Sequence, residues 1–103
     1  MHRASDCVEE RFYEFHRDRP GREIGRMIPR PFAVSRLHRK QDVYTPLGSD
    51  ARALAKDVQK GKAAWEGAHD PGYYPHYHPA GNHDEYGHVF YGDTGYREDE
   101  KRA

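Results

Sequence analysis

The sequence has little of what would place the chain in several common classes of protein. Cys7 is the only cysteine, so neither an intrachain disulfide nor a cysteine-ligated zinc cluster can form. No apolar run approaches the length of a transmembrane helix, and the first residues show no apolar core of a signal peptide. We therefore expect no association with a membrane, and the scarcity of cysteine suits action in a cytoplasm.

Apolar residues are also scarce, and this limits the size of the core. Hydrophobic residues make up 35% of the 103 residues, and 33% are charged. A chain of this length holds one domain at most. Because much of the apolar content is Tyr and Ala, we expect a thin core, with about two thirds of the chain packed, and a monomer when free.

A net charge of zero hides an asymmetry along the chain. Residues 1–62 hold 14 Lys and Arg against 9 acids, whereas residues 63–103 hold 3 against 8. The densest basic block runs from Arg19 to Lys40, with seven basic residues and only Glu23 opposing them. Such a block can hold phosphates, although a solvated connector would show the same composition.

Local patterns predict one good helix in an α+β domain. Ala51, Leu54, Ala55 and Val58 form one apolar face within residues 48–62, with Ser49 or Asp50 as N-cap and Gly61 as the stop. Upstream, Val8, Phe12 and Phe15 recur at helical spacing. Pro29 and Pro31 exclude a helix across that point, and the spacing predicts a short extended piece at residues 32–34.

Two aromatic segments after residue 72 predict an antiparallel hairpin with a long loop. Residues 73–78 and 88–91 are bounded by Gly and Pro, and the loop between them is polar. Alternate residues of a strand share a face, so His76 and His78 point the same way, with Tyr74 beside them and Tyr77 opposite. If the register brings His88 alongside, three imidazoles meet on one surface of a small antiparallel sheet.

These residue types suit RNA cleavage without a metal. Histidine serves as general base or general acid near neutral pH, and Lys or Arg stabilises the charge that develops on the phosphate. We expect His76 or His78 as the base, His88 as the acid, and Lys56 or Lys60 on the phosphate. Tyr91 and Tyr77 can bind or stack a base, and aromatic residues beside cations are typical of single-stranded RNA recognition. The further substrate-binding candidates are Lys60, Lys62, Arg52, Tyr77 and Tyr74.

Two other interpretations fit the same residues. His76, His78 and His88 can act as three ligands of zinc or manganese, completed by His83 or Asp84 from the loop, in a metal-dependent nuclease or hydrolase. Alternatively, the tyrosine-rich face belongs to a non-enzymatic module that binds a protein partner, with partly buried histidines that are structural.

Three blocks in order resemble a known class of domain. They are residues 49–51 with residues 54–56, then residues 72–79, then residues 88–92, and together they span roughly residues 42–92. This pattern resembles the C-terminal toxin domains of bacterial polymorphic toxins of the Rhs, wall-associated and contact-dependent inhibition type. Several such domains have a barnase-like fold, in which one or two N-terminal helices pack on a small antiparallel sheet.

The resemblance implies a function, a location and a set of residues. It implies an RNase that is secreted or delivered as part of a larger bacterial protein, acts on RNA in the cytoplasm of a target cell, and is neutralised by a cognate immunity protein. It favours His76, His78, His88 and Tyr91, with Asp50 and Lys56 as weaker candidates. We accordingly expect a basic, partly flexible or helical N-terminal region at residues 1–41, a toxin-like core at residues 42–92 and a charged tail at residues 93–103, with no cofactor.

Overall fold

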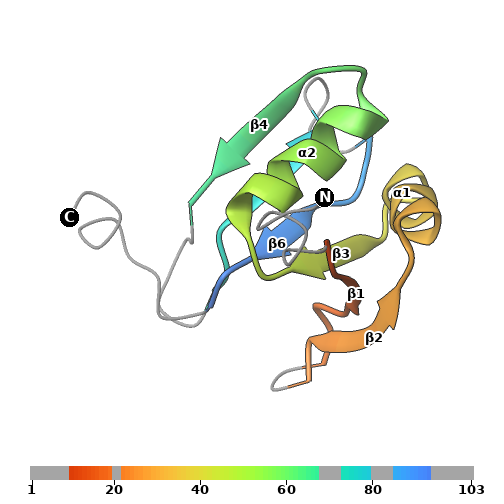
Figure 1. The fold of residues 1–103 in the computed structure, drawn as a ribbon. Coiled ribbons are helices and arrows are strands. Elements are labelled where there is room, and N and C mark those ends of the chain that lie inside the picture. Colours follow the sequence, from red (N-terminus) through yellow and green to blue (C-terminus); the bar gives the residue numbers. More distant parts are fainter. Residues whose placement is uncertain (1–9, 20–21, 68–72, 80–84, 94–103) are drawn as a thin grey trace, which may run out of the picture.

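The computed structural model describes residues 10–19, 22–67, 73–79 and 85–93 (Figure 1). Within these ranges the chain forms two helices and six strands, which confirms the α+β class. In chain order the elements are β1 (Phe12–Phe15), β2 (Ile24–Ile28), α1 (Arg30–His38), β3 (Asp42–Thr45), α2 (Gly48–Val58), β4 (Ala63–Glu66), β5 (His76–Pro79) and β6 (Val89–Tyr91).

The strands form one mixed sheet in the order β2-β1-β3-β6-β5-β4. All neighbouring strands run antiparallel except β3 and β6, which are parallel, with Val43 opposite Val89. A parallel pair needs a long crossover, and here α2, β4 and β5 form it. The predicted hairpin is confirmed as β5 and β6, with His76 opposite Phe90. The sheet is larger than predicted and is not purely antiparallel, because β3 joins it beside β6.

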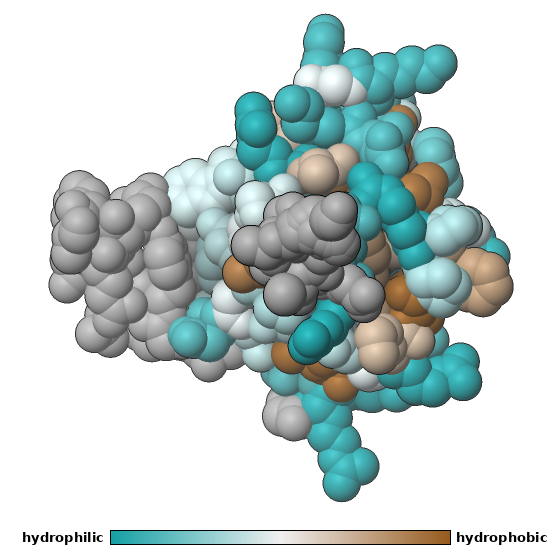
Figure 2. Space-filling view, viewed as in Figure 1, coloured by the Kyte–Doolittle hydropathy of each residue, from teal (hydrophilic) through white to brown (hydrophobic). Residues whose placement is uncertain are grey.

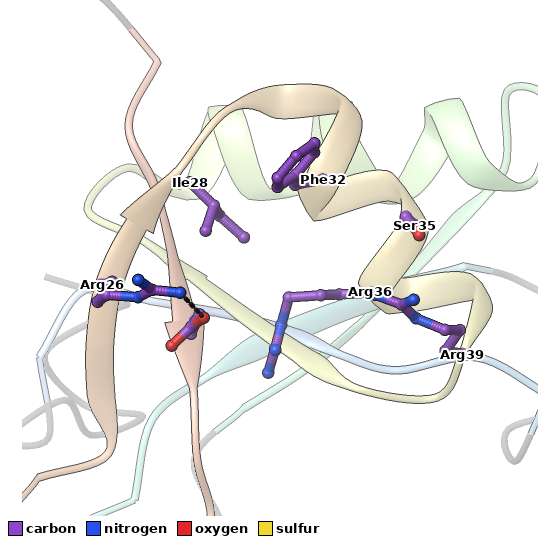
Figure 3. Close-up of a pocket in the computed structure, with 7 residues that line it drawn as sticks. Arg26, Ile28, Phe32, Ser35, Arg36 and Arg39 are labelled. Atoms are coloured by element: carbon purple, nitrogen blue, oxygen red, sulfur yellow. Dashed lines mark ion pairs between the residues drawn. The ribbon is translucent and has the colours of Figure 1, made fainter.

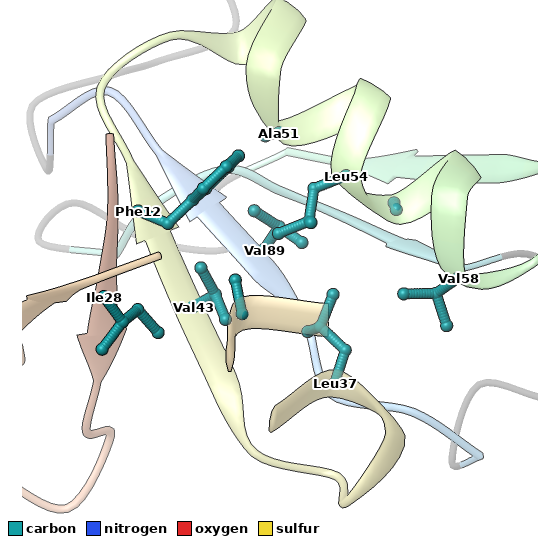
Figure 4. Packing of buried hydrophobic residues seen from close by; sticks show 10 residues of the cluster. Phe12, Ile28, Leu37, Val43, Ala51, Leu54, Val58 and Val89 are labelled. Carbon is teal, nitrogen blue, oxygen red and sulfur yellow. The ribbon is translucent and has the colours of Figure 1, made fainter. Parts of the chain in front are cut away.

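Both helices contribute to a single apolar cluster on one face of the sheet, which we call the helix face (Figure 4). The predicted apolar residues of α2, including Leu54, are buried and lie over Val43 of β3 and Val89 of β6. Figure 1 shows α2 crossing in front of the central strands. None of the helices in the described part of the chain is long and apolar enough to cross a membrane.

The N-terminal expectations were partly wrong. The segment from Phe12 to Phe15 is a strand and not a helix, because it pairs with β2 on one side and with β3 on the other. Phe12 packs against the helix-face cluster, whereas Phe15 packs with Tyr44 and Phe90 in a second buried cluster. Strand pairing and burial on both faces of the sheet therefore override the helical spacing.

The basic block is more ordered than predicted. Residues 32–34 lie in helix α1 and not in an extended piece, with Ala33 and Leu37 buried. The helix begins after Pro29, and Pro31 lies in its first turn, where the missing N–H costs nothing. The predicted N-terminal region, residues 1–41, thus contributes β1, β2, α1 and several core residues to the fold.

The boundaries of α2 differ slightly from the prediction. Its N-cap is Leu47, without a side-chain hydrogen bond, so neither Ser49 nor Asp50 caps the helix. At the other end Gly61 has a φ of 94° and donates its N–H to the Lys56 carbonyl, as expected of a glycine after a helix.

Shortening Leu54 tests the apolar cluster. Leu54→Ala leaves a cavity beneath α2, so we expect the free energy of unfolding to fall by about 2–5 kcal/mol. Arg52→Ala on the exposed side of the same helix is the matched control, with an expected change within about 0.5 kcal/mol. Urea unfolding followed by circular dichroism measures both. Equal, small effects of the two changes would contradict the packing described above.

Candidate functional site

The three histidines gather on the sheet face opposite the helices, which we call the distal face. His76 and His78 alternate with Tyr77 along β5, and His88 directly precedes β6. Their ring centroids are 4.7 Å apart for His76 and His88, 5.4 Å for His78 and His88, and 6.2 Å for His76 and His78. The predicted meeting of three imidazoles on one surface is confirmed, and we call this group the histidine cluster.

Gly87 allows His88 to take its place in the cluster. The Gly87 N–H donates to the Leu37 carbonyl, and a Cβ atom at Gly87 would overlap the carbonyl oxygen of Gln41. Only glycine permits this close approach of two backbone segments. The chain can therefore enter β6 beside the start of β3, with His88 directed toward β5.

Glu66 bridges two of the histidines. It lies opposite His76 in the β4–β5 pairing. Its Oε1 atom is 3.2 Å from His76 Nε2, and its Oε2 atom is 3.6 Å from His78 Nε2. The histidines are only 5–7% exposed, whereas the Glu66 side chain is 33% exposed. Glu66 is therefore the accessible member of this group.

Burial sets the protonation state of His76. Burial, followed by the neighbouring His88 ring, lowers the pKa of His76 to about 4, although Glu66 acts in the opposite direction. His76 is consequently neutral at neutral pH. In contrast, the two nitrogens of His78 both face acceptors, since Nδ1 lies 3.0 Å from the Pro79 carbonyl oxygen and Nε2 faces Glu66.

His88 is held by the ion pair between the half-exposed Arg17 and the buried Asp42. Arg17 donates from Nε and Nη2 to the two carboxylate oxygens of Asp42, over 2.6 Å and 3.0 Å. Its Nη2 atom also lies 2.7 Å from His88 Nδ1. Because a guanidinium group only donates, Nδ1 is the acceptor in this contact.

Asp42 completes this arrangement from β3. Burial would raise the pKa of the Asp42 carboxyl, but the side chains of His88 and Arg17 and the His88 backbone N–H outweigh it and lower the pKa from 3.8 to about 2. The His88 N–H donates to Asp42 Oδ1 over 2.9 Å. The carboxylate is therefore ionised and joins Arg17, β3 and the entry to β6.

Aromatic rings flank the histidine cluster on the same face. Phe15 and Phe90 stack at 4.4 Å between ring centroids, and Tyr74 meets the Phe15 ring edge-on at 5.4 Å. Phe90 also contacts His76, with 5.0 Å between the ring centroids, and Arg17 lies 5.5 Å above Phe90. The aromatic rings thus support one side of His76 and the stem of Arg17.

The remaining candidates from the sequence lie elsewhere. Tyr77 and Tyr91 stack on each other on the helix face, and Tyr91 accepts a hydrogen bond from Trp65. Arg52 and Lys56 lie on α2, across the sheet from the histidine cluster, and Lys60 follows that helix. Lys62 precedes β4. Of the proposed binding residues, Tyr74 lies on the distal face, where it packs with Phe15 and Phe90.

The sequence analysis missed Glu66, Asp42 and Arg17. Alternation along β3 places Asp42 on the same face as Tyr44, but the pairing of β3 with β6 has no local signal. Within the described ranges, no set of three or more His, Cys, Asp or Glu side chains has the arrangement of a metal site. His83 and Asp84, the additional ligands of the metal interpretation, lie outside those ranges, so the zinc or manganese alternative stays a prediction.

Comparison with protein-family models, with curated sequences and with solved structures finds no match to this chain. The case for a function consequently depends on the geometry of the distal face and on the residues described above.

Titration of Asp42 provides a test of the buried ion pair. Its depressed pKa contributes stability that is present above pH 3.8 and is lost as the pH falls toward 2. We expect the free energy of unfolding to fall between pH 5 and pH 2 by about 2 kcal/mol more in the wild-type protein than in Asp42→Asn. Denaturant unfolding over this pH range measures the difference, and parallel curves for the two proteins would contradict it.

Proposed function

We propose that the protein is a metal-independent endoribonuclease whose active centre consists of the histidine cluster, Glu66 and Arg17. The observation that carries the proposal is the Glu66 carboxylate, within 3.6 Å of two imidazoles, on the face where an arginine and a carboxylate hold the third. RNA cleavage by its own 2′-hydroxyl needs a proton acceptor, a proton donor and a cation. This group offers all three.

The proton acceptor is the pair of Glu66 and His76. With its low pKa, His76 is neutral at neutral pH, and its Nε2 atom lies 3.2 Å from Oε1 of the Glu66 carboxylate. The pair can therefore take up one proton. Glu66 is the more exposed residue of the pair, and its carboxylate meets the 2′-hydroxyl. His76 orients that carboxylate.

The proton donor is His78. Both of its nitrogens face oxygen atoms, and its Nε2 atom lies 3.6 Å from Oε2 of the Glu66 carboxylate, beside the group that meets the 2′-hydroxyl. The sequence analysis had given this role to His88. However, Nδ1 of His88 accepts from Arg17, so this nitrogen is not available to donate a proton to the substrate. We assign His88 to positioning, between the ion pair and the other two rings.

Arg17 supplies the positive charge in place of Lys56 or Lys60. Its contacts with Asp42 and His88 use Nε and Nη2, and its side chain is 55% exposed. A guanidinium group held in a fixed orientation can donate to a phosphate oxygen without reorganisation as charge develops in the transition state.

The reaction balances with these groups alone. The 2′-oxygen attacks phosphorus as its proton passes to Glu66, and the bond from phosphorus to the 5′-oxygen breaks. His78 donates a proton to the departing 5′-oxygen. The products are a 2′,3′-cyclic phosphate and a free 5′-hydroxyl. Glu66 then releases its proton to water and His78 takes one up from water, which restores the enzyme.

The biological setting follows from the resemblance to polymorphic toxin domains. On that basis the chain is delivered as part of a larger bacterial protein, cleaves RNA in the cytoplasm of a target cell, and is held inactive at home by an immunity protein. The acid–base centre of the distal face supports the enzymatic part of this proposal.

Cleavage of RNA by the purified protein tests the function directly. We expect the protein to degrade total RNA, to continue in the presence of a chelator, and to lose activity by on the order of 10²-fold or more in His78→Ala. His38→Ala, an exposed histidine on α1, is the matched control and retains activity. Gel electrophoresis of RNA and DNA digests is the measurement.

Each other outcome of this assay points to a different function. Loss of activity in chelator would make the histidines metal ligands. Degradation of neither nucleic acid would favour the non-enzymatic binding module, and a folded His78→Ala protein with full activity would remove His78 from the site.

Replacing Glu66 tests the proton acceptor. Glu66→Gln keeps the shape of the side chain but cannot accept the proton, so kcat falls by on the order of 10²-fold. In the wild-type protein activity also declines as the pH falls toward 4, because His76 then becomes protonated. A pH–rate profile measures both effects, with the exposed Glu85→Gln as control. An unchanged acid limb in Glu66→Gln would show that another group accepts the proton.

A further inference from the structure

A cavity lies on the helix face, away from the histidine cluster. It has a volume of about 360 Å³ and lies between β1, β2 and α1. Figure 3 shows Arg26 on β2 and Arg36 on α1 directed into the space between these elements, with Phe32 and Ile28 at one end and Arg39 beyond α1. We call this cavity the arginine pocket.

The lining of the arginine pocket is strongly positive. Three guanidinium groups, those of Arg26, Arg36 and Arg39, face a single carboxylate, that of Glu14. The Glu14 Oε2 atom lies 3.6 Å from Nη2 of Arg26, and the Arg26 side chain is 86% exposed. In the part of the chain that the structure describes, no carboxylate lies within ion-pair distance of Arg36 or Arg39. The lining therefore has an excess of two positive charges, concentrated around one concavity.

Arg36 is held in place by the backbone. It donates from Nε to the Asp42 carbonyl over 2.9 Å and from Nη2 to the Phe15 carbonyl over 3.4 Å. The Nη1 atom takes no part in these bonds. A guanidinium group that is anchored in this way loses little side-chain entropy when it binds an anion.

An exposed aromatic ring stands beside the three cations. Phe32 lines the arginine pocket and is 62% exposed, although it is a large apolar side chain. Met27, on the neighbouring strand, is equally exposed. Figure 2 shows polar residues over most of the visible face, with apolar residues gathered mainly on the side of α1 and β2. Guanidinium groups beside an accessible aromatic ring match a phosphate joined to a base.

The arginine pocket and the histidine cluster meet at one residue. The Asp42 carbonyl accepts from Arg36, whereas its side chain binds Arg17 and the backbone of His88. Both sites thus lie at the same end of β3, on opposite faces of the sheet. A single-stranded nucleic acid that passes around this end can contact both.

We infer that the arginine pocket binds a nucleotide of the single-stranded RNA substrate beyond the cleaved bond, with its phosphate on Arg26, Arg36 and Arg39 and its base on Phe32. The inference rests on the proposed ribonuclease function. The volume is at the small end of the range for ligand sites, which is about 300–1,000 Å³, and suits one nucleotide. An acidic protein partner would require a broad, flat surface of about 800 Å² per partner, which a small concave pocket does not provide.

Binding of an uncleavable RNA tests the arginine pocket separately from catalysis. A short fluorescein-labelled 2′-O-methyl oligouridylate lacks the nucleophile, so fluorescence anisotropy reports binding alone. We expect Arg39→Glu to weaken binding at least tenfold and to reduce the slope of log K against log salt by about 0.7. Phe32→Ala should weaken binding about tenfold. Arg22→Glu and Met27→Ala, which do not line the pocket, are the matched controls and should have much smaller effects.

The outcomes separate this inference from the proposed function. Equal losses in Arg39→Glu and Arg22→Glu would overturn the inference, because the effect would then be one of overall charge. Displacement of the oligonucleotide by poly-glutamate at equal affinity, with the same loss in Arg39→Glu, would make the pocket a site for acidic polypeptides. Cleavage of unmodified RNA by the wild-type protein is scored in parallel. Its absence defeats the ribonuclease proposal, whereas intact cleavage with unaltered binding in Arg39→Glu defeats only the inference about the pocket.

Discussion

The buried carboxylate of Asp42 joins the segments from which the distal face is built. The carboxylate accepts hydrogen bonds from Arg17, which follows β1, and from the backbone N–H of His88, which precedes β6. The backbone carbonyl of Asp42 accepts a further hydrogen bond from Arg36 of α1. A buried charge is costly unless it is paired and fully hydrogen-bonded, so these donors must be present together. The requirement couples β1, α1, β3 and β6, and it sets the position of His88 relative to β5.

The two faces of the sheet serve different purposes because the apolar residues are few. Leu54, Val43 and their neighbours form one thin core beneath the helices, to which α2 contributes Ala51, Leu54, Ala55 and Val58. The distal face is stabilised by aromatic stacking around Phe15 and Phe90 and by charge-assisted hydrogen bonds. Titratable groups can therefore be buried there without disrupting the main core. The same arrangement places Glu66 and Arg17, the more exposed groups, at the margins of the histidine cluster.

The fold places the basic residues of the N-terminal half and the titratable residues of the later strands at different sites. The basic N-terminal half contributes Arg17 to the distal face and Arg26, Arg36 and Arg39 to the arginine pocket. The later strands contribute the Glu66 carboxylate and the imidazoles of the proposed active centre. The cations of the arginine pocket and the titratable groups of the distal face thus come largely from different parts of the chain. In the proposed enzyme they meet at the end of β3, where Asp42 contacts both sets. This division explains why neither half contains a complete site.

Local patterns were sufficient to predict α2, the two strands of the β5–β6 hairpin and the common face of His76 and His78, because each depends on spacing within one short segment. The meeting with His88 was predicted only on condition of the hairpin register, which the pairing of β5 with β6 supplies. The fate of Phe12–Phe15 was not predictable in this way, since its spacing fits a helix and only pairing with β2 and β3 makes it a strand. Glu66 beside His76, and Arg17 on Asp42 and His88, depend on strand register and on contacts between residues up to 71 positions apart. The sequence by itself determined which elements could form and which side chains would share a strand face, because the backbone repeat dictates both. The tertiary structure alone decided which carboxylates and cations meet the histidines, because pairing between distant strands leaves no periodic signal along the chain.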